Sequence, residues 1–204
     1  DIIAHELAHQ WFGDKITCRN WENIWLNEGF ATYGQAIYHE AVGGITAYNE
    51  FMRPTMANAK TAVGTIYVQD VNSIAEIFSP NRTYAKGCVV LHMLRGVIGD
   101  SAFFKTLRYF ASDTALAYKT AVTEDFQNAA ERVSLQSLDY FFHQWIYGEN
   151  YPKYNVSWTT ETVSNSLYKA NITIQQDINT FPNFFTMPVE IEIVTQAGDC
   201  LLYT

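Results

Sequence analysis

The sequence predicts an α+β chain in two parts, a mainly helical part over residues 1–152 and a strand-rich part over residues 153–204. The first part has apolar residues at helical spacing, and Ser or Thr residues that suit helix N-termini. The second part begins after Pro152, alternates apolar and polar residues, and is rich in Val, Ile and Thr. This change of period places the expected domain boundary at residue 153.

Within the first part, helices are expected at residues 1–13, 23–42, 46–62, 83–98, 101–112, 123–133 and 137–147. Gly13, the Gly43-Gly44 pair and Gly99 end three of them, because glycine adopts the backbone conformations that terminate helices. Residues 15–22 are expected to form a connection. Most of residues 63–82 should be a loop, since this stretch has no long helical period.

In the second part, strands are expected at residues 154–163, 166–176 and 187–196, with turns at Ser164-Asn165, near Pro182 and at Ala197-Gly198. About 50 residues of strand would begin a β-sandwich without completing one. The chain starts inside an expected helix and ends inside an apolar run. We therefore expect it to be a piece of a longer protein.

Composition excludes several classes of protein. Of the 204 residues, 48% are hydrophobic and 17% are charged, which is typical of a globular chain. The net charge of −8 argues against a nucleic-acid partner. No apolar run reaches the roughly 18 residues of a membrane-spanning helix. The three cysteines, Cys18, Cys88 and Cys200, are widely spaced, so we expect buried thiols and neither a disulfide framework nor a thiolate metal site.

The first 28 residues contain a candidate metal site. His5 and His9 lie four positions apart, which puts both imidazoles on one face of a helix. Glu28 follows His9 after 18 residues and supplies a carboxylate. Two histidines and one glutamate leave the fourth position of a zinc ion open for water, as in catalytic sites. Glu6, directly after His5, can reach that water without binding the metal. The full pattern arises by chance in about 1 in 2,000 chains of this composition.

A metal ion, its water and a base would not by themselves complete a peptidase site. Such a site also needs a hydrogen-bond donor for the negative charge that develops on the substrate carbonyl. A tyrosine hydroxyl is suitable, because it stays protonated at neutral pH. The chain has 13 tyrosines, and the residues alone do not choose among them.

The motif HELAHQWFGD, followed by WENIWLNEGFATY, resembles the aminopeptidase N family of zinc metallopeptidases, in the gluzincin group. Further similar stretches are IAEIFSPNRTYAKG, VVLHMLR and FFHQWIYGENYP, so the resemblance covers about residues 1–160. The spacing HExxH-x18-E, the WFG after the second histidine and the later YxKG together are specific for the family.

The resemblance implies one zinc ion bound by His5, His9 and Glu28. It implies Glu6 as the general base and Tyr84 as the donor to the tetrahedral intermediate. It also implies a thermolysin-like catalytic subdomain, truncated at its N-terminus, followed by the start of a β-sandwich truncated at its C-terminus. The family's GxMEN motif, which binds the substrate α-amine, does not occur in this chain. The N- and C-terminal domains of the parent protein are expected partners.

The main hypothesis is a zinc metallopeptidase, the catalytic core of an aminopeptidase that hydrolyses N-terminal peptide bonds. Two alternatives use the same site, a thermolysin-like endopeptidase and an epoxide hydrolase. An alternative from another class is a non-catalytic scaffolding module. The isolated chain is expected to be inactive or weakly active. The sequence indicates neither the compartment, the oligomeric state nor the side chain preferred at the cleaved residue.

Overall fold

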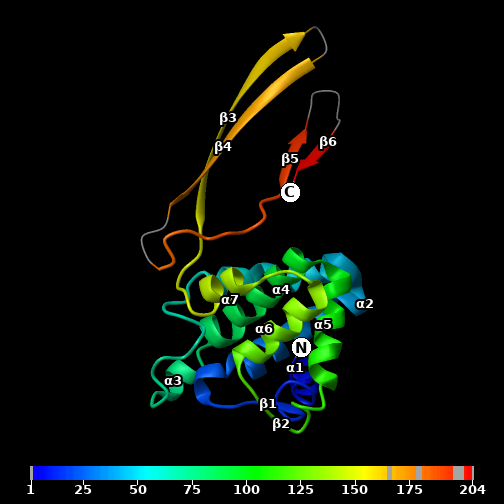
Figure 1. Ribbon diagram of the computed structural model, residues 1–204, viewed down its shortest axis with the longest axis vertical. Coiled ribbons are helices and arrows are strands. Elements are labelled where there is room, and N and C mark those ends of the chain that lie inside the picture. Colours follow the sequence, from blue (N-terminus) through cyan, green and yellow to red (C-terminus); the bar gives the residue numbers. More distant parts are fainter. Residues whose placement is uncertain (1, 165–166, 178–180, 195–199, 204) are drawn as a thin grey trace.

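The computed structural model describes residues 2–164, 167–177, 181–194 and 200–203. Helices pack together in the first part of the chain, and strands follow in the last part (Figure 1). The helices are α1 (Ile2–His9), η1 (Trp21–Asn23), α2 (Trp25–Ala59), α3 (Ile74–Ile77), η2 (Pro80–Lys86), α4 (Gly87–Ile98), α5 (Asp100–Ser112), α6 (Thr123–Ser134) and α7 (Asp139–Trp145). The predicted α+β class is confirmed.

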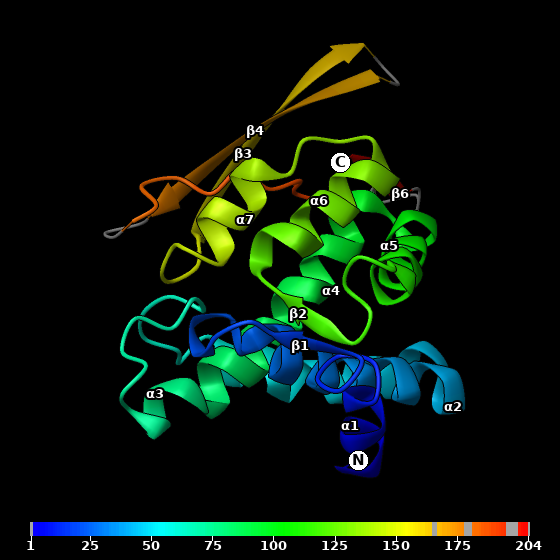
Figure 2. The same cartoon turned by 60° about the horizontal axis from the view of Figure 1, so that its bottom comes forward.

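The described strands form three two-stranded sheets. β1 (Ile16–Cys18) pairs in parallel with β2 (Lys119–Ala121), within the helical part (Figure 2). β3 (Lys153–Ser164) and β4 (Leu167–Asp177) form a long antiparallel hairpin, and β5 (Ile191–Val194) pairs antiparallel with β6 (Cys200–Tyr203). β1 falls within residues 15–22, which were expected to be a connection, and no strand was expected at β2. Each strand has three residues and its partner lies about a hundred positions away, so no local pattern indicates the pair.

The long helix α2 consists of two segments. At Gly44 the backbone adopts φ 68° and ψ −164°, a conformation that favours glycine and breaks the helix. The two expected helices at 23–42 and 46–62 are therefore present on either side of a break. The hydroxyls of Tyr33 and Tyr48 lie 3.2 Å apart, whereas fifteen residues of straight helix span about 22 Å. The second segment thus folds back beside the first.

The expected helix at 83–98 differs in its first turn. Residues Pro80–Lys86 form a π-helix, η2, which runs directly into the α-helix α4. The short helix α3 precedes it, inside the stretch that was expected to be mostly loop. The π-helix was missed because its extra residue per turn leaves no 3.6-residue period to recognise.

The start of α2 is fixed by buried hydrogen bonds to the start of α6. The Asn23 side-chain oxygen accepts hydrogen bonds from the backbone N–H (2.9 Å) and hydroxyl (2.7 Å) of Thr123. The same hydroxyl accepts a hydrogen bond from the indole N–H of Trp25 at 2.9 Å. Around them, aromatic rings from several helices fill the core, including Phe30, which contacts Phe126. Glu28, one turn into α2, is thereby carried on a rigid element.

Helices α2 and α4 cross where two glycines meet. A Cβ added at Gly87 would lie 3.0 Å from the Cα of Gly29, a tighter contact than most Cβ atoms make. Only glycine at both positions lets the two backbones come this close. The crossing brings η2, which precedes Gly87, beside the residue that follows Glu28.

The β3–β4 hairpin extends away from the helices (Figure 1), and every residue of β3 is exposed. Its register pairs Val156 with Ile174 and Trp158 with Ile172, so apolar side chains gather on one face. The expected turn at residues 197–198 lies outside the described residues.

Part of the strand-rich region belongs to the helical core. Phe185 is fully buried, and its ring lies 4.4 Å from that of Trp145 in α7. Thr186 donates its backbone N–H to the side-chain oxygen of Gln144 at 2.7 Å. The segment 181–187 is thus docked on α7.

Two further observations concern the described residues. Cys18 and Cys88 are buried free thiols, as expected. None of the described helices has the length and apolar character needed to cross a membrane.

Candidate metal centre

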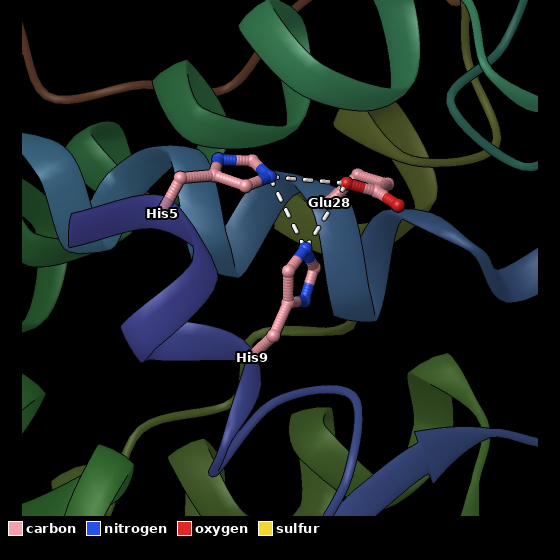
Figure 3. A group of neighbouring side chains, drawn as sticks. All are labelled: His5, His9 and Glu28. Carbon is pink, nitrogen blue, oxygen red and sulfur yellow. Dashed lines mark hydrogen bonds and ion pairs between the residues drawn. The ribbon is translucent and has the colours of Figure 1, made fainter. Parts of the chain in front are cut away.

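His5 and His9 project from the same face of α1 toward Glu28 on α2 (Figure 3). The Nε2 atoms of the two histidines lie 3.1 Å apart. The Oε2 atom of Glu28 lies 3.3 Å from His5 Nε2 and 3.4 Å from His9 Nε2. The three residues predicted as metal ligands are therefore brought together in the fold.

The distances between these three atoms fit a tetrahedral zinc ion. Ligands at about 2.0–2.1 Å from zinc, in tetrahedral geometry, are about 3.3 Å from one another. The three observed separations lie close to that value. Among the described residues, this is the one group of His, Cys, Asp or Glu side chains close enough to hold a metal ion.

The other ring nitrogen of each histidine is held by a hydrogen bond. His5 Nδ1 lies 3.3 Å from the side-chain oxygen of Gln35, and His9 Nδ1 lies 3.0 Å from the carbonyl oxygen of Phe12. Both partners are acceptors, so each Nδ1 carries the proton and each Nε2 is left as a lone-pair donor for a metal. Gly13 has φ 147°, and a Cβ there would lie 3.0 Å from His9 Nδ1. This explains a glycine directly after Phe12.

The negative charge of Glu28 favours the binding of a cation at this site. Burial by itself would raise the pKa of Glu28. The imidazoles of His5 and His9, when they carry a second proton at Nε2, donate hydrogen bonds to its carboxylate, and these outweigh burial and lower that pKa to about 2. The hydrogen bond to Glu28 raises the pKa of His9. A carboxylate that is ionised at all physiological pH values is suited to bind a metal ion.

Tyr84 approaches the same site from the π-helix η2. Its ring is stacked on that of His5, with 6.0 Å between the centroids. Burial, and next the negative charge of Glu28, raise the pKa of Tyr84 to about 12, so its hydroxyl is a hydrogen-bond donor at neutral pH. π-Helical turns occur frequently at functional sites.

Buried side chains next to Tyr84 hold η2 in place. Arg82 donates to the carbonyl oxygens of Val63 (3.1 Å) and Glu76 (2.7 Å), in the preceding loop and in α3. Thr83 donates from its hydroxyl to the carbonyl oxygens of Ile77 (3.0 Å) and Ser79 (3.1 Å). These contacts tie the loop and the π-helix into one unit.

Glu6 lies on α1 next to His5, and its side chain is exposed. Its negative charge contributes to the raised pKa values of His9 and Tyr84. The carboxylate therefore lies within electrostatic range of both the candidate metal ligand His9 and Tyr84.

A pocket of about 350 Å³ opens beside the site. His5 and Tyr84 form one wall. The other lining residues come from both segments of α2 and from η2: Thr32, Gln35, Pro54, Thr55, Asn58, Pro80 and Ala85.

The sequence did not predict the two partners of the histidine rings. Gln35 lies seven residues after Glu28, two helical turns along the same face, and this spacing is a signal that could have suggested it. The carbonyl oxygen of Phe12 has no signal in the residue types, because any residue supplies a backbone carbonyl.

Comparison with known proteins is consistent with this geometry. Residues 1–145 match the model of the peptidase family M1 domain. The chain belongs to peptidase family M1. The family predicted from the sequence motifs is thereby confirmed.

Several curated M1 relatives are aminopeptidases. The chain is 35% identical over 164 residues to aminopeptidase M1-A of Oryza sativa subsp. japonica, a match that covers 76% of this chain and 18% of that protein. It is 34% identical over 163 residues to aminopeptidase N of Lactococcus lactis subsp. lactis, covering 74% of this chain and 19% of that protein. The chain therefore spans about a fifth of the length of these relatives.

Solved structures give the same fold. An M1 zinc metallopeptidase from Deinococcus radiodurans is 27% identical, with a TM-score of 0.61 over 73% of this chain and 33% of that chain. Aminopeptidase A of Legionella pneumophila, in complex with aspartic acid, has a TM-score of 0.74 over 99% of this chain and 23% of that chain. At 20% identity, the second likeness concerns the fold alone.

Proposed function

We propose that this chain is the catalytic core of a zinc-dependent aminopeptidase, which binds one zinc ion and removes N-terminal residues from peptides. The observation that carries the proposal is the tetrahedral spacing of His5, His9 and Glu28, with each histidine turned toward the site by a hydrogen bond on its other nitrogen. M1 relatives named as aminopeptidases support the reaction, and the M1 zinc metallopeptidase structure supports the metal.

The role that we propose for each residue follows from its position in the site. When bound, the zinc ion would polarise the substrate carbonyl and lower the pKa of a water molecule. Glu6 accepts a proton from the attacking water and passes it to the leaving amine. Tyr84 donates a hydrogen bond to the carbonyl oxygen as negative charge develops on it. These roles use the protonation states that the site imposes, an ionised Glu28 and a protonated Tyr84.

We further propose that residues 1–152 form the catalytic subdomain and residues 153–204 the start of a β-sandwich. The clustering of apolar side chains on one face of the β3–β4 hairpin supports this, because such a face suits the interior of a sandwich. The boundary is crossed by segment 181–187, which packs on α7.

The decisive experiment replaces Glu6 in the intact protein that contains this chain. Glu6→Gln keeps the size of the side chain but removes the base. We expect zinc content to be unchanged and kcat for an alanine p-nitroanilide substrate to fall by about a thousandfold. Glu50→Gln, the same change at an exposed position of α2, is the matched control and should leave kcat unchanged. Near-normal turnover by Glu6→Gln would overturn the assignment.

Zinc binding can be measured on this chain alone. Elemental analysis should find about one zinc per chain in the wild type and almost none in His9→Ala, because two ligands bind zinc far more weakly than three. Equal zinc content in the two proteins would show that the ligands are assigned wrongly.

A further inference from the structure

A second pocket, of about 720 Å³, lies near the break in α2, away from the metal centre. Glu40 lines it, and this residue comes twelve positions after Glu28, or about 18 Å along the helix. Tyr48, just past the break at Gly44, lines it too. The other walls come from α4, from the start of α5 and from the chain that leads into β5, which passes above the helices in Figure 1. This pocket is therefore distinct from the pocket beside the metal centre.

The ring of His92 supplies this pocket with a hydrogen-bond donor. The hydroxyl oxygen of Tyr48 lies 2.6 Å from His92 Nδ1, a distance typical of a hydroxyl donor and shorter than N–H donors usually make. Tyr48 therefore donates and Nδ1 accepts. Burial, and next the charge of Arg95, lower the pKa of His92, so the ring is neutral at pH 7 and its one proton is on Nε2. This N–H makes no hydrogen bond to the described residues.

The charged residues of the lining have a net negative charge. The guanidinium of Arg95 donates to both oxygens of Glu40, at 2.6 and 2.8 Å, and to both oxygens of Asp100, at 2.8 Å. One positive charge is thus surrounded by two negative charges. Glu190 adds a third negative charge, and it has no ion-pair partner in the part of the chain that the structure describes. This excess of negative charge favours a cation as ligand.

The remaining walls of this pocket are largely apolar. The aliphatic and thioether side chains among them are those of Ile45, Met93, Val97 and Met187. Hydrocarbon is favoured against such walls, because its burial removes apolar surface from water. A cation, in contrast, loses hydration on entering the pocket, and this cost is offset only where carboxylates replace the lost water. The lining therefore suits a ligand that is cationic at one end and hydrocarbon in its body.

We propose that this pocket binds a small organic amine, in which a short hydrocarbon chain joins an ammonium group to a neutral hydrogen-bond acceptor such as an amide oxygen. The ammonium group pairs with Glu190 and with the excess charge around Arg95, and the acceptor binds the Nε2–H of His92. The hydrocarbon chain packs on the apolar walls. The inference does not depend on the proposed peptidase function, because none of these residues lines the metal pocket.

The test uses the intact, zinc-loaded protein and titration calorimetry. The probe is 5-aminopentanamide, whose ammonium group is distant from its carbonyl, unlike that of a peptide N-terminus. Pentanamide, which lacks the ammonium group, should bind about tenfold more weakly. Glu190→Gln should raise the Kd of 5-aminopentanamide by about fivefold, because it removes one partner of the ammonium group. Glu50→Gln removes the same charge at an exposed position of α2 outside the pocket, and this matched control should leave the Kd unchanged.

Gly96→Leu provides a second, independent variant. Gly96 lines the pocket, and a Cβ there would meet no atom within 4 Å, so a leucine side chain can occupy the space without displacing α4. This variant should lose binding of 5-aminopentanamide and keep its zinc content. A wild-type Kd in both Glu190→Gln and Gly96→Leu would overturn the site, and so would equal binding of the two probes. Failure of the wild type to bind 5-aminopentanamide would overturn it as well.

Discussion

The pKa of the Tyr84 hydroxyl depends on the residues that surround it. Burial and the charge of Glu28 raise its pKa to about 12, and this keeps the hydroxyl protonated. In the intact protein, Tyr84→Phe should lower kcat by about a hundredfold, because one donor to the developing oxyanion is worth about 2.7–4 kcal/mol. KM and zinc content should change little.

Tyr67→Phe is a suitable control for that measurement, since Tyr67 lies in the loop before α3 and does not line the metal pocket. A Tyr84→Phe enzyme with the wild-type kcat would exclude the hydroxyl from the reaction.

Lys86 is a buried residue with an unusual environment. Its amino group has no hydrogen-bond partner among the described residues, and burial lowers its pKa from 10.5 to about 8. The folded protein therefore binds fewer protons than the unfolded chain between about pH 8 and pH 10.5, so this residue makes stability rise with pH in that window. Lys86→Met should be more stable than the wild type at pH 7, by up to about 3 kcal/mol.

The difference between the two proteins should shrink as the pH approaches 10, where the wild-type amine is neutral. Urea denaturation of this chain at several pH values measures it. Lys105→Met, at an exposed position of α5, should show no such dependence. A constant difference between wild type and Lys86→Met across this range would contradict the lowered pKa.

At the scale of elements, the crossing of α2 and α4 determines where Tyr84 lies relative to Glu28. Gly87→Ala would place a Cβ 3.0 Å from the Cα of Gly29, so the two helix backbones would have to move apart by a few tenths of an ångström. We expect a loss of about 1–3 kcal/mol in unfolding free energy, as for other overpacked sites. Zinc affinity should also fall, because the shift would be transmitted to Glu28.

Gly96→Ala on the same helix is the matched control. A Cβ there meets no atom within 4 Å, and alanine favours helix over glycine by about 1 kcal/mol. The two substitutions should therefore change stability in opposite directions. Equal effects would mean that the crossing is not tightly packed in solution.

For the whole molecule, Phe185 joins the strand-rich part to the helices. Its ring is fully buried against Trp145, and its backbone N–H and carbonyl are both bound by Gln176, at 2.9 and 2.6 Å. Phe185→Ala should lower the unfolding free energy of this chain by about 3–5 kcal/mol, the usual loss for a buried phenylalanine.

Phe184→Ala should change the unfolding free energy by less than about 0.5 kcal/mol, because the neighbouring ring is largely exposed. Both variants can be compared with the wild type by urea denaturation. Similar losses for the two would show that segment 181–187 does not dock on α7.

Much of this fold was predictable from local patterns. Seven expected helices have counterparts in the structure, and β3 (Lys153–Ser164) overlaps the strand expected at residues 154–163. Helical period, helix caps and strand alternation are all properties of residues that are close in the sequence. The β1–β2 pair and the docking of Phe185 were not predictable, since each depends on a contact between distant parts of the chain.

The sequence by itself predicted the candidate metal-ligand set, His5, His9 and Glu28, and the side chains of these three residues converge in the structure from two helices. Only the tertiary structure decided which groups orient the imidazoles, how the π-helix presents Tyr84, and that a pocket without fixed charge lies beside them. The physical reason is that ligand spacing is a local property of helices. Hydrogen-bond partners and pocket walls instead come from residues that meet only when α2 reverses at Gly44 and crosses α4.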